Sequence, residues 1–90
     1  MGLRLAAEAQ AYLRTIPPEP RRRIREAVAR LAEDPYADEL DIRPVRSLGG
    51  GRLYRCRVGS FRIVFAVVPE GARVLRVFHR RDGYGWLERL

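Results

Sequence analysis

One stretch of this 90-residue sequence decides its fold: Leu53-Tyr54-Arg55-Cys56-Arg57-Val58-Gly59-Ser60-Phe61-Arg62-Ile63-Val64-Phe65. Residues 52–58 alternate in polarity and residues 61–68 are almost continuously apolar, and both patterns are typical of strands. The Gly59-Ser60 pair between them suits the two-residue loop of a β-hairpin. Because a run that is apolar on both faces belongs in the middle of a sheet, residues 61–68 are predicted as the central strand.

The two-residue loop fixes a register in which Arg57 lies opposite Arg62. Residues two apart share a face of a strand, so one face collects apolar side chains, namely Tyr54, Cys56, Val58, Phe61, Ile63 and Phe65. The other face presents Arg55, Arg57 and Arg62 together. Like charges directly opposite destabilise a sheet by up to about 1 kcal/mol. The arginine pair therefore suggests an anion that resolves the repulsion, although a solvated face is the ordinary alternative.

A further strand is predicted over residues 72–79, after a turn at Pro69-Glu70-Gly71. A loop of three or of four residues would place either Phe78 or His79 opposite Arg62, and a one-residue slip exchanges the two faces. Both registers bring the end of this strand beside Arg62. The candidate functional residues there are His79, Arg80, Arg81 and Tyr84.

The N-terminal third predicts two helices. Leu3–Leu5 can form a short opening strand, and apolar residues at helical spacing follow over residues 6–16. Pro17-Pro18 ends the first helix, and proline is accepted in the first turn of the next. The second helix closes at Asp34-Pro35 and buries Ile24, Ala27, Val28 and Leu31. Residues 35–51 are a connection with an extended piece near residues 40–45. The fold class is therefore α+β, a helical hairpin on one face of a small, mostly antiparallel sheet.

Length and charge limit the function. Ninety residues make one domain, 1–90, without a transmembrane run or a secretory signal, so we expect a cytoplasmic protein. Cys56 is the single cysteine, which excludes an internal disulfide. The net charge is +7, and residues 52–90 hold nine arginines and three acidic residues, a net of +6. This asymmetry points to a polyanion or an acidic protein partner, or serves solubility alone.

The basic cluster suits RNA cleavage. Breaking a phosphodiester needs a base, an acid and cations around the phosphorane, and arginine supplies only the last. His79 and Tyr84 are the conventional proton-transfer groups of the cluster, although a lone histidine is more often structural and a tyrosine near a terminus can cap the core. Acidic residues do not cluster near the arginines, so we expect no metal site. The sequence has no phosphate loop or dinucleotide fingerprint, so we expect no cofactor.

Four motifs in order resemble the RelE/ParE toxin superfamily over nearly the whole chain. They are the hairpin quoted above, Pro17–Ile24 at the start of the second helix, Leu31–Pro35 at its end, and His79–Tyr84. The resemblance implies the RelE-like fold, with a helical hairpin on a four-stranded sheet, and a cognate antitoxin as partner. Members of the RelE branch enter the ribosomal A site and cut mRNA.

The resemblance also implies roles for single residues. Arg55 and Arg57 would be phosphate or proton-relay positions, Arg62 and Arg80 would stabilise the transition state, and Tyr84 would act as base or stacking group. Arg81 would add a further phosphate contact, and His79 remains a candidate for catalysis or for structure.

Departures from the pattern keep alternatives open. Arginine replaces the lysine common at positions 55 and 57, which weakens a role as base, and Phe65 stands where many members have tyrosine. The ParE branch shares the fold but poisons DNA gyrase, and the strand end Val77–Arg81 is close to its pattern. Tyr84 favours an mRNA endonuclease. A gyrase-poisoning toxin, or an inactive basic nucleic-acid-binding relative, is the alternative.

Overall fold

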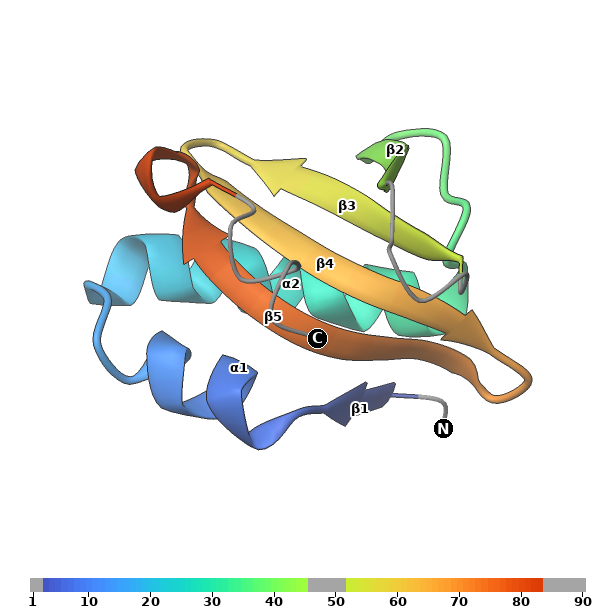
Figure 1. Cartoon of the computed structure of the whole chain (residues 1–90), viewed down its shortest axis with the longest axis horizontal. Helices are drawn as coiled ribbons and strands as arrows, with labels where there is room; N and C mark the ends of the chain where they lie inside the picture. The colour runs from blue at the N-terminus through green and yellow to red at the C-terminus, as the bar shows by residue number, and fades with distance from the viewer. Residues whose placement is uncertain (1–2, 46–51, 84–90) are drawn as a thin grey trace.

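The computed structural model describes residues 3–45 and 52–83 of the chain (Figure 1). Its elements follow in the order β1 (Leu3–Leu5), α1 (Ala7–Leu13), α2 (Pro18–Glu33), β2 (Asp41–Val45), β3 (Leu53–Val58), β4 (Phe61–Val68), β5 (Gly71–His79) and the 3₁₀ turn η1 (Arg80–Asp82). The predicted helices and strands are all present. Neither helix in these two ranges has the length and apolar character that crossing a bilayer requires.

The strands form one sheet in the order β1-β5-β4-β3-β2. The strands β2, β3, β4 and β5 are antiparallel neighbours, which confirms the helical hairpin on a mostly antiparallel, four-stranded sheet. The three-residue β1 adds an edge parallel to β5. As predicted, the apolar strand β4 is central, and Figure 1 shows it between β3 and β5.

The hairpin register is the one that the two-residue loop predicts. Val58 pairs with Phe61, Arg57 with Arg62 and Cys56 with Ile63. Gly59 has φ +57°, a left-handed conformation that glycine adopts without steric cost. The sequence of the turn therefore decides which side chains share a face of the sheet.

A β-bulge sets the register between β4 and β5. Val68 pairs with Gly71, so the loop holds two residues rather than the three or four expected. The pairing then shifts by one residue between Val64 and Phe65, which leaves Leu75 as an extra residue. The shift places Phe78, and not His79, opposite Arg62. It also turns Val77 into the core, where a regular ladder would have placed Arg76 opposite Ile63.

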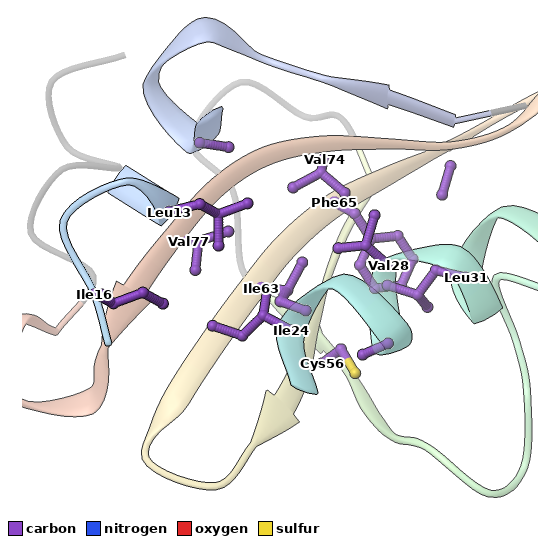
Figure 2. Close-up of a cluster of buried hydrophobic side chains, with 13 residues drawn as sticks. Leu13, Ile16, Ile24, Val28, Leu31, Cys56, Ile63, Phe65, Val74 and Val77 are labelled. Atoms are coloured by element: carbon purple, nitrogen blue, oxygen red, sulfur yellow. The ribbon is translucent and has the colours of Figure 1, made fainter. Parts of the chain in front are cut away.

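The core lies between the two helices and one face of the sheet (Figure 2). Ala9, Leu13 and Ile16 come from the first helical segment, and the predicted stripe of Ile24, Ala27, Val28 and Leu31 comes from α2. The sheet contributes Cys56, Ile63, Phe65, Val74 and Val77. Burial raises the pKa of the Cys56 thiol to about 11, so this cysteine is a protonated core residue.

Candidate functional site

The arginine face is the side of the sheet that turns away from α1 and α2. We define it by Arg43 on β2, Arg55 and Arg57 on β3, and Arg62 on β4. Arg43 pairs with Arg55, and Arg57 pairs with Arg62, whereas the neighbouring Cys56 and Ile63 point into the helix-covered core. The structure therefore brings together the three arginines predicted to share this face and adds a fourth from the edge strand.

Asp41 holds the centre of the arginine face. Its carboxylate oxygens lie 3.6 Å from Arg43 Nε, 3.7 Å from Arg55 Nη1 and 3.6 Å from Arg57 Nη1. Arg55 Nη1 also donates to the Asp41 main-chain carbonyl at 3.4 Å. One carboxylate among three guanidinium groups offsets part of the repulsion that the sequence predicts, and the arginine face keeps a net positive charge.

Arg62 is fixed by the turn that precedes it. Its Nη1 donates to the carbonyl oxygens of Gly59 and Phe61, each at 3.0 Å. These bonds hold the guanidinium at the β3–β4 turn, and its remaining N–H donors suit an anion near that turn. Arg62 is thus a positioned cation and also a support of the hairpin.

A small apolar cluster lies on the same side of the sheet. Leu53, Val64 and Phe78 are buried there, separate from the main core. Phe78 pairs with Arg62, and Val64 pairs with Arg55. The arginines therefore border an apolar surface, where partial exclusion of water strengthens charge interactions.

His79 lies on the helix side of the sheet. It pairs with Phe61, and the two rings meet edge to face with centroids 5.2 Å apart. His79 Nδ1 accepts a hydrogen bond from the Arg81 backbone N–H at 3.1 Å, so Nδ1 carries no proton when this bond is made. These contacts make His79 the cap of η1 and separate it from the arginine face.

Tyr12 of α1 joins this end of the sheet and was not among the sequence candidates. Its ring lies edge-on to Phe61, with centroids 6.4 Å apart. Burial and then the Asp82 carboxylate raise the pKa of Tyr12, so its hydroxyl stays protonated at neutral pH. Tyr12 therefore serves the packing of η1 and is a poor general base.

The turn η1 carries Arg80 and Arg81 as exposed side chains. The Arg80 backbone N–H donates to Ser60 O at 2.8 Å, which ties η1 to the β3–β4 turn, and Figure 1 draws the two side by side. The sequence prediction that these arginines leave β5 beside the hairpin is confirmed. Tyr84, the other predicted catalytic residue, lies outside the described residues.

Comparison with known proteins identifies the family. The sequence pattern described as "ParE toxin of type II toxin-antitoxin system, parDE" matches residues 3–84. The chain belongs to the ParE toxin family. The protein is accordingly a type II toxin of the RelE/ParE superfamily, as the four motifs predicted. No curated protein matches the toxin significantly.

Solved RelE structures share the fold of this toxin. The RelB–RelE complex from Methanococcus jannaschii is 26% identical, with a TM-score of 0.72 over 92% of this chain and 96% of that chain. RelBE2 from Mycobacterium tuberculosis is 25% identical, with a TM-score of 0.70 over 87% and 95%. The RelE–RelB complex from Pyrococcus horikoshii OT3 is 22% identical, with a TM-score of 0.72 over 89% and 97%.

Two residues of the site escaped sequence reasoning, Asp41 and Tyr12. Asp41 is an acid at the start of the extended piece near residues 40–45, and pairing that piece with β3 would have placed it opposite Arg57. Tyr12 flanks the apolar stripe of α1, but its proximity to η1 depends on how α1 packs on β5. The first was recoverable from the pattern, and the second was not.

Proposed function

We propose that this toxin is a ribosome-dependent mRNA endonuclease, and that the whole chain, 1–90, is one toxin domain. The observation that carries the proposal is the arginine face, with Arg55, Arg57 and Arg62 adjacent on the uncovered side of the sheet. Guanidinium groups bind phosphate oxygens in a forked geometry and stabilise the charge that builds on a phosphorane. The 26% and 25% identical relatives with the same fold are RelE toxins, which supports the same branch.

The roles follow from the contacts. Arg55 and Arg57, oriented by Asp41, bind the backbone phosphates, and Arg81 adds a contact from η1. Arg62, fixed at the turn, and Arg80 stabilise the transition state. Because arginine hardly deprotonates and His79 is engaged on the helix side, Tyr84 moves the proton.

The reaction proposed needs no cofactor and no metal ion. Asp41 is surrounded by guanidinium groups, which compete with any cation for its oxygens. Within residues 3–45 and 52–83, no three side chains of His, Cys, Asp or Glu gather as a possible metal site. Arginine then supplies the charge that a metal ion would supply in other nucleases.

The proposed partners are a cognate antitoxin, the ribosome and mRNA. Three structural relatives were crystallised as RelB–RelE complexes. An acidic or amphipathic stretch of the antitoxin would cover the arginine face or displace the C-terminal segment of this toxin. The proposed site of action is the cytoplasm, without a membrane.

The substitution Tyr84→Phe tests the proposal. The variant keeps the ring and loses the hydroxyl, so cleavage of ribosome-bound mRNA should slow by roughly a hundredfold or more. The matched control is Tyr36→Phe, because Tyr36 is the exposed tyrosine of the α2–β2 connection, with 59% of its surface accessible. We expect the control to cut at the wild-type rate. Single-turnover cleavage with purified ribosomes, together with mapping of mRNA 5′ ends after induction, gives both readouts.

Gyrase poisoning is the second candidate. The observation that favours it is His79, which turns away from the arginine face and leaves that face without a described proton carrier. A gyrase poison needs no proton transfer, so Tyr84→Phe would remain fully toxic and mRNA would stay intact in arrested cells. That pair of results would replace the nuclease proposal with this one.

A further inference from the structure

We propose a second phosphate-binding site on the helix side of the β3–β4 turn, outside the arginine face. Its cations are Arg23 of α2 and Arg57 of β3, and its floor includes Gly59. The ligand class is a phosphate group, and the source is the backbone of a nucleic-acid strand that also crosses the arginine face. The choice of a strand rests on the proposed function, whereas the anion site itself does not.

The site is a hollow of about 310 Å³ between α2 and the end of the hairpin. Arg23 and Ala27 line it from the helix, and Leu40 lines it from the connection before β2. Arg57 and the turn close the opposite side. Apolar walls with a few converging polar groups are the usual make-up of a binding site.

Two further charged residues line the hollow, and both are occupied. The guanidinium of Arg30 is bonded to Glu39 and lies 3.4 Å from Glu33. The carboxylate of Glu26 lies 2.7 Å from Arg22 Nη1. The positive charge of Arg30 and the negative charge of Glu26 are therefore largely balanced by their own partners.

Arg23 and Arg57 differ from that pair. Arg23 is exposed and forms no salt bridge among residues 3–45 and 52–83. Arg57 is half exposed and has only a third share of the Asp41 carboxylate, at 3.6 Å. The hollow thus has two cations with donor capacity for an anion.

Gly59 lets Arg23 approach the turn. A Cβ added at Gly59 would lie 3.4 Å from Arg23 Nη1 and 3.5 Å from Nη2. The guanidinium therefore lies over the turn backbone, at a residue whose φ of +57° already favours glycine. A side chain at this position would fill the space that the phosphate is proposed to occupy.

The position of Arg57 links the new site to the arginine face. Arg57 pairs with Arg62 on the sheet and also lines the hollow. On the other side of the turn, η1 is bonded to Ser60 and carries Arg80 and Arg81. Arginines from α2, β3, β4 and η1 thus surround one turn. A small anion would occupy one of these positions, whereas a strand with successive phosphates can occupy several.

The test compares Arg23→Gln with Arg25→Gln in the full-length toxin. Both residues are exposed on α2 and lose the same charge, but Arg25 lies outside the hollow. The probe is a single-stranded 2′-O-methyl RNA, which lacks the attacking hydroxyl and cannot be cut. We expect Arg23→Gln to reduce the slope of log affinity against log salt by about 0.7, the loss of one phosphate contact on a single strand. Arg25→Gln should leave the slope of the wild type.

A second measurement uses inorganic phosphate and amide NMR. Phosphate should shift the Gly59 amide in the wild type and in Arg25→Gln, and not in Arg23→Gln. A Gly59 shift combined with equal salt slopes would overturn the nucleic-acid strand as the source. Absence of the shift, or its persistence in Arg23→Gln, would overturn the site. Neither readout involves cleavage, so failure of the proposed nuclease activity is distinguished from failure of this site.

Discussion

At the scale of single residues, Asp41 shows how the toxin tolerates a crowded row of arginines. Its carboxylate lies 3.6–3.7 Å from three guanidinium groups, beyond ordinary hydrogen-bond length. The interaction is therefore mainly charge on charge, and salt should screen it. Only 18% of the Arg55 side chain is exposed, so this arginine depends most on the nearby negative charge.

The substitution Asp41→Asn should destabilise the fold. It keeps the shape of the side chain and leaves Arg43, Arg55 and Arg57 to repel one another. We expect the free energy of unfolding to fall by about 1 kcal/mol at low salt and by less at high salt. Urea denaturation at both salt concentrations measures the difference.

The control for this prediction is Asp38→Asn. Asp38 is exposed and has no ion pair among the described residues, so its loss should change stability little. Equal losses for the two variants, or a loss at Asp41 that salt does not reduce, would show that the carboxylate does not offset the arginine repulsion.

At the scale of elements, the bulge in β5 determines what faces the arginines. Val74 and Val77 both enter the core although they are three residues apart, which a regular strand does not allow. The extra residue, Leu75, packs on the other side with Val64 and Phe78. The sequence carries this signal, because Arg73 and Arg76 are also three apart, and the pattern breaks strict alternation.

Helix α2 supports the sheet through one stripe, and a substitution there tests the core. Ile24 is fully buried against the sheet, so Ile24→Ala should lower the free energy of unfolding by about 2–5 kcal/mol. Arg25→Ala, on the exposed side of the same helix, should change it by less than about 0.5 kcal/mol. Thermal or chemical denaturation compares the two. Similar losses would mean that the packing face of α2 has been assigned incorrectly.

At the scale of the whole molecule, charge is concentrated in the half that builds the sheet. Residues 52–90 have a net charge of +6, whereas residues 1–51 hold nine arginines and eight acidic residues. The acidic residues of the helices are largely engaged locally, as the pairs of Arg22 with Glu19 and Glu26 show. The sheet side is therefore the surface that an acidic partner would approach.

This asymmetry predicts the kinetics of antitoxin binding. Electrostatic steering accelerates association, so the association rate with the cognate antitoxin should fall about tenfold or more between low and high salt. Arg57→Glu should weaken this salt dependence strongly, and the matched charge reversal Arg25→Glu on α2 should do so less. Stopped-flow mixing measures the rates. An association rate that does not change with salt would contradict the proposed docking on the arginine face.

The sequence by itself determined the helices, the central strand, the β3–β4 register and the company of Arg55, Arg57 and Arg62. These features depend on local patterns: apolar spacing, proline stops and a two-residue turn that fixes every pairing beyond it.

Only the tertiary structure decided the face of His79, the role of Asp41 and the hollow beside Arg23. The face of His79 depends on a bulge four residues earlier, which shifts the pairing by one residue. Asp41 meets the arginines through the pairing of an edge strand, and Arg23 meets Gly59 through the packing of a helix distant in sequence. Such contacts depend on the three-dimensional positions of separate elements, which local sequence patterns do not fix.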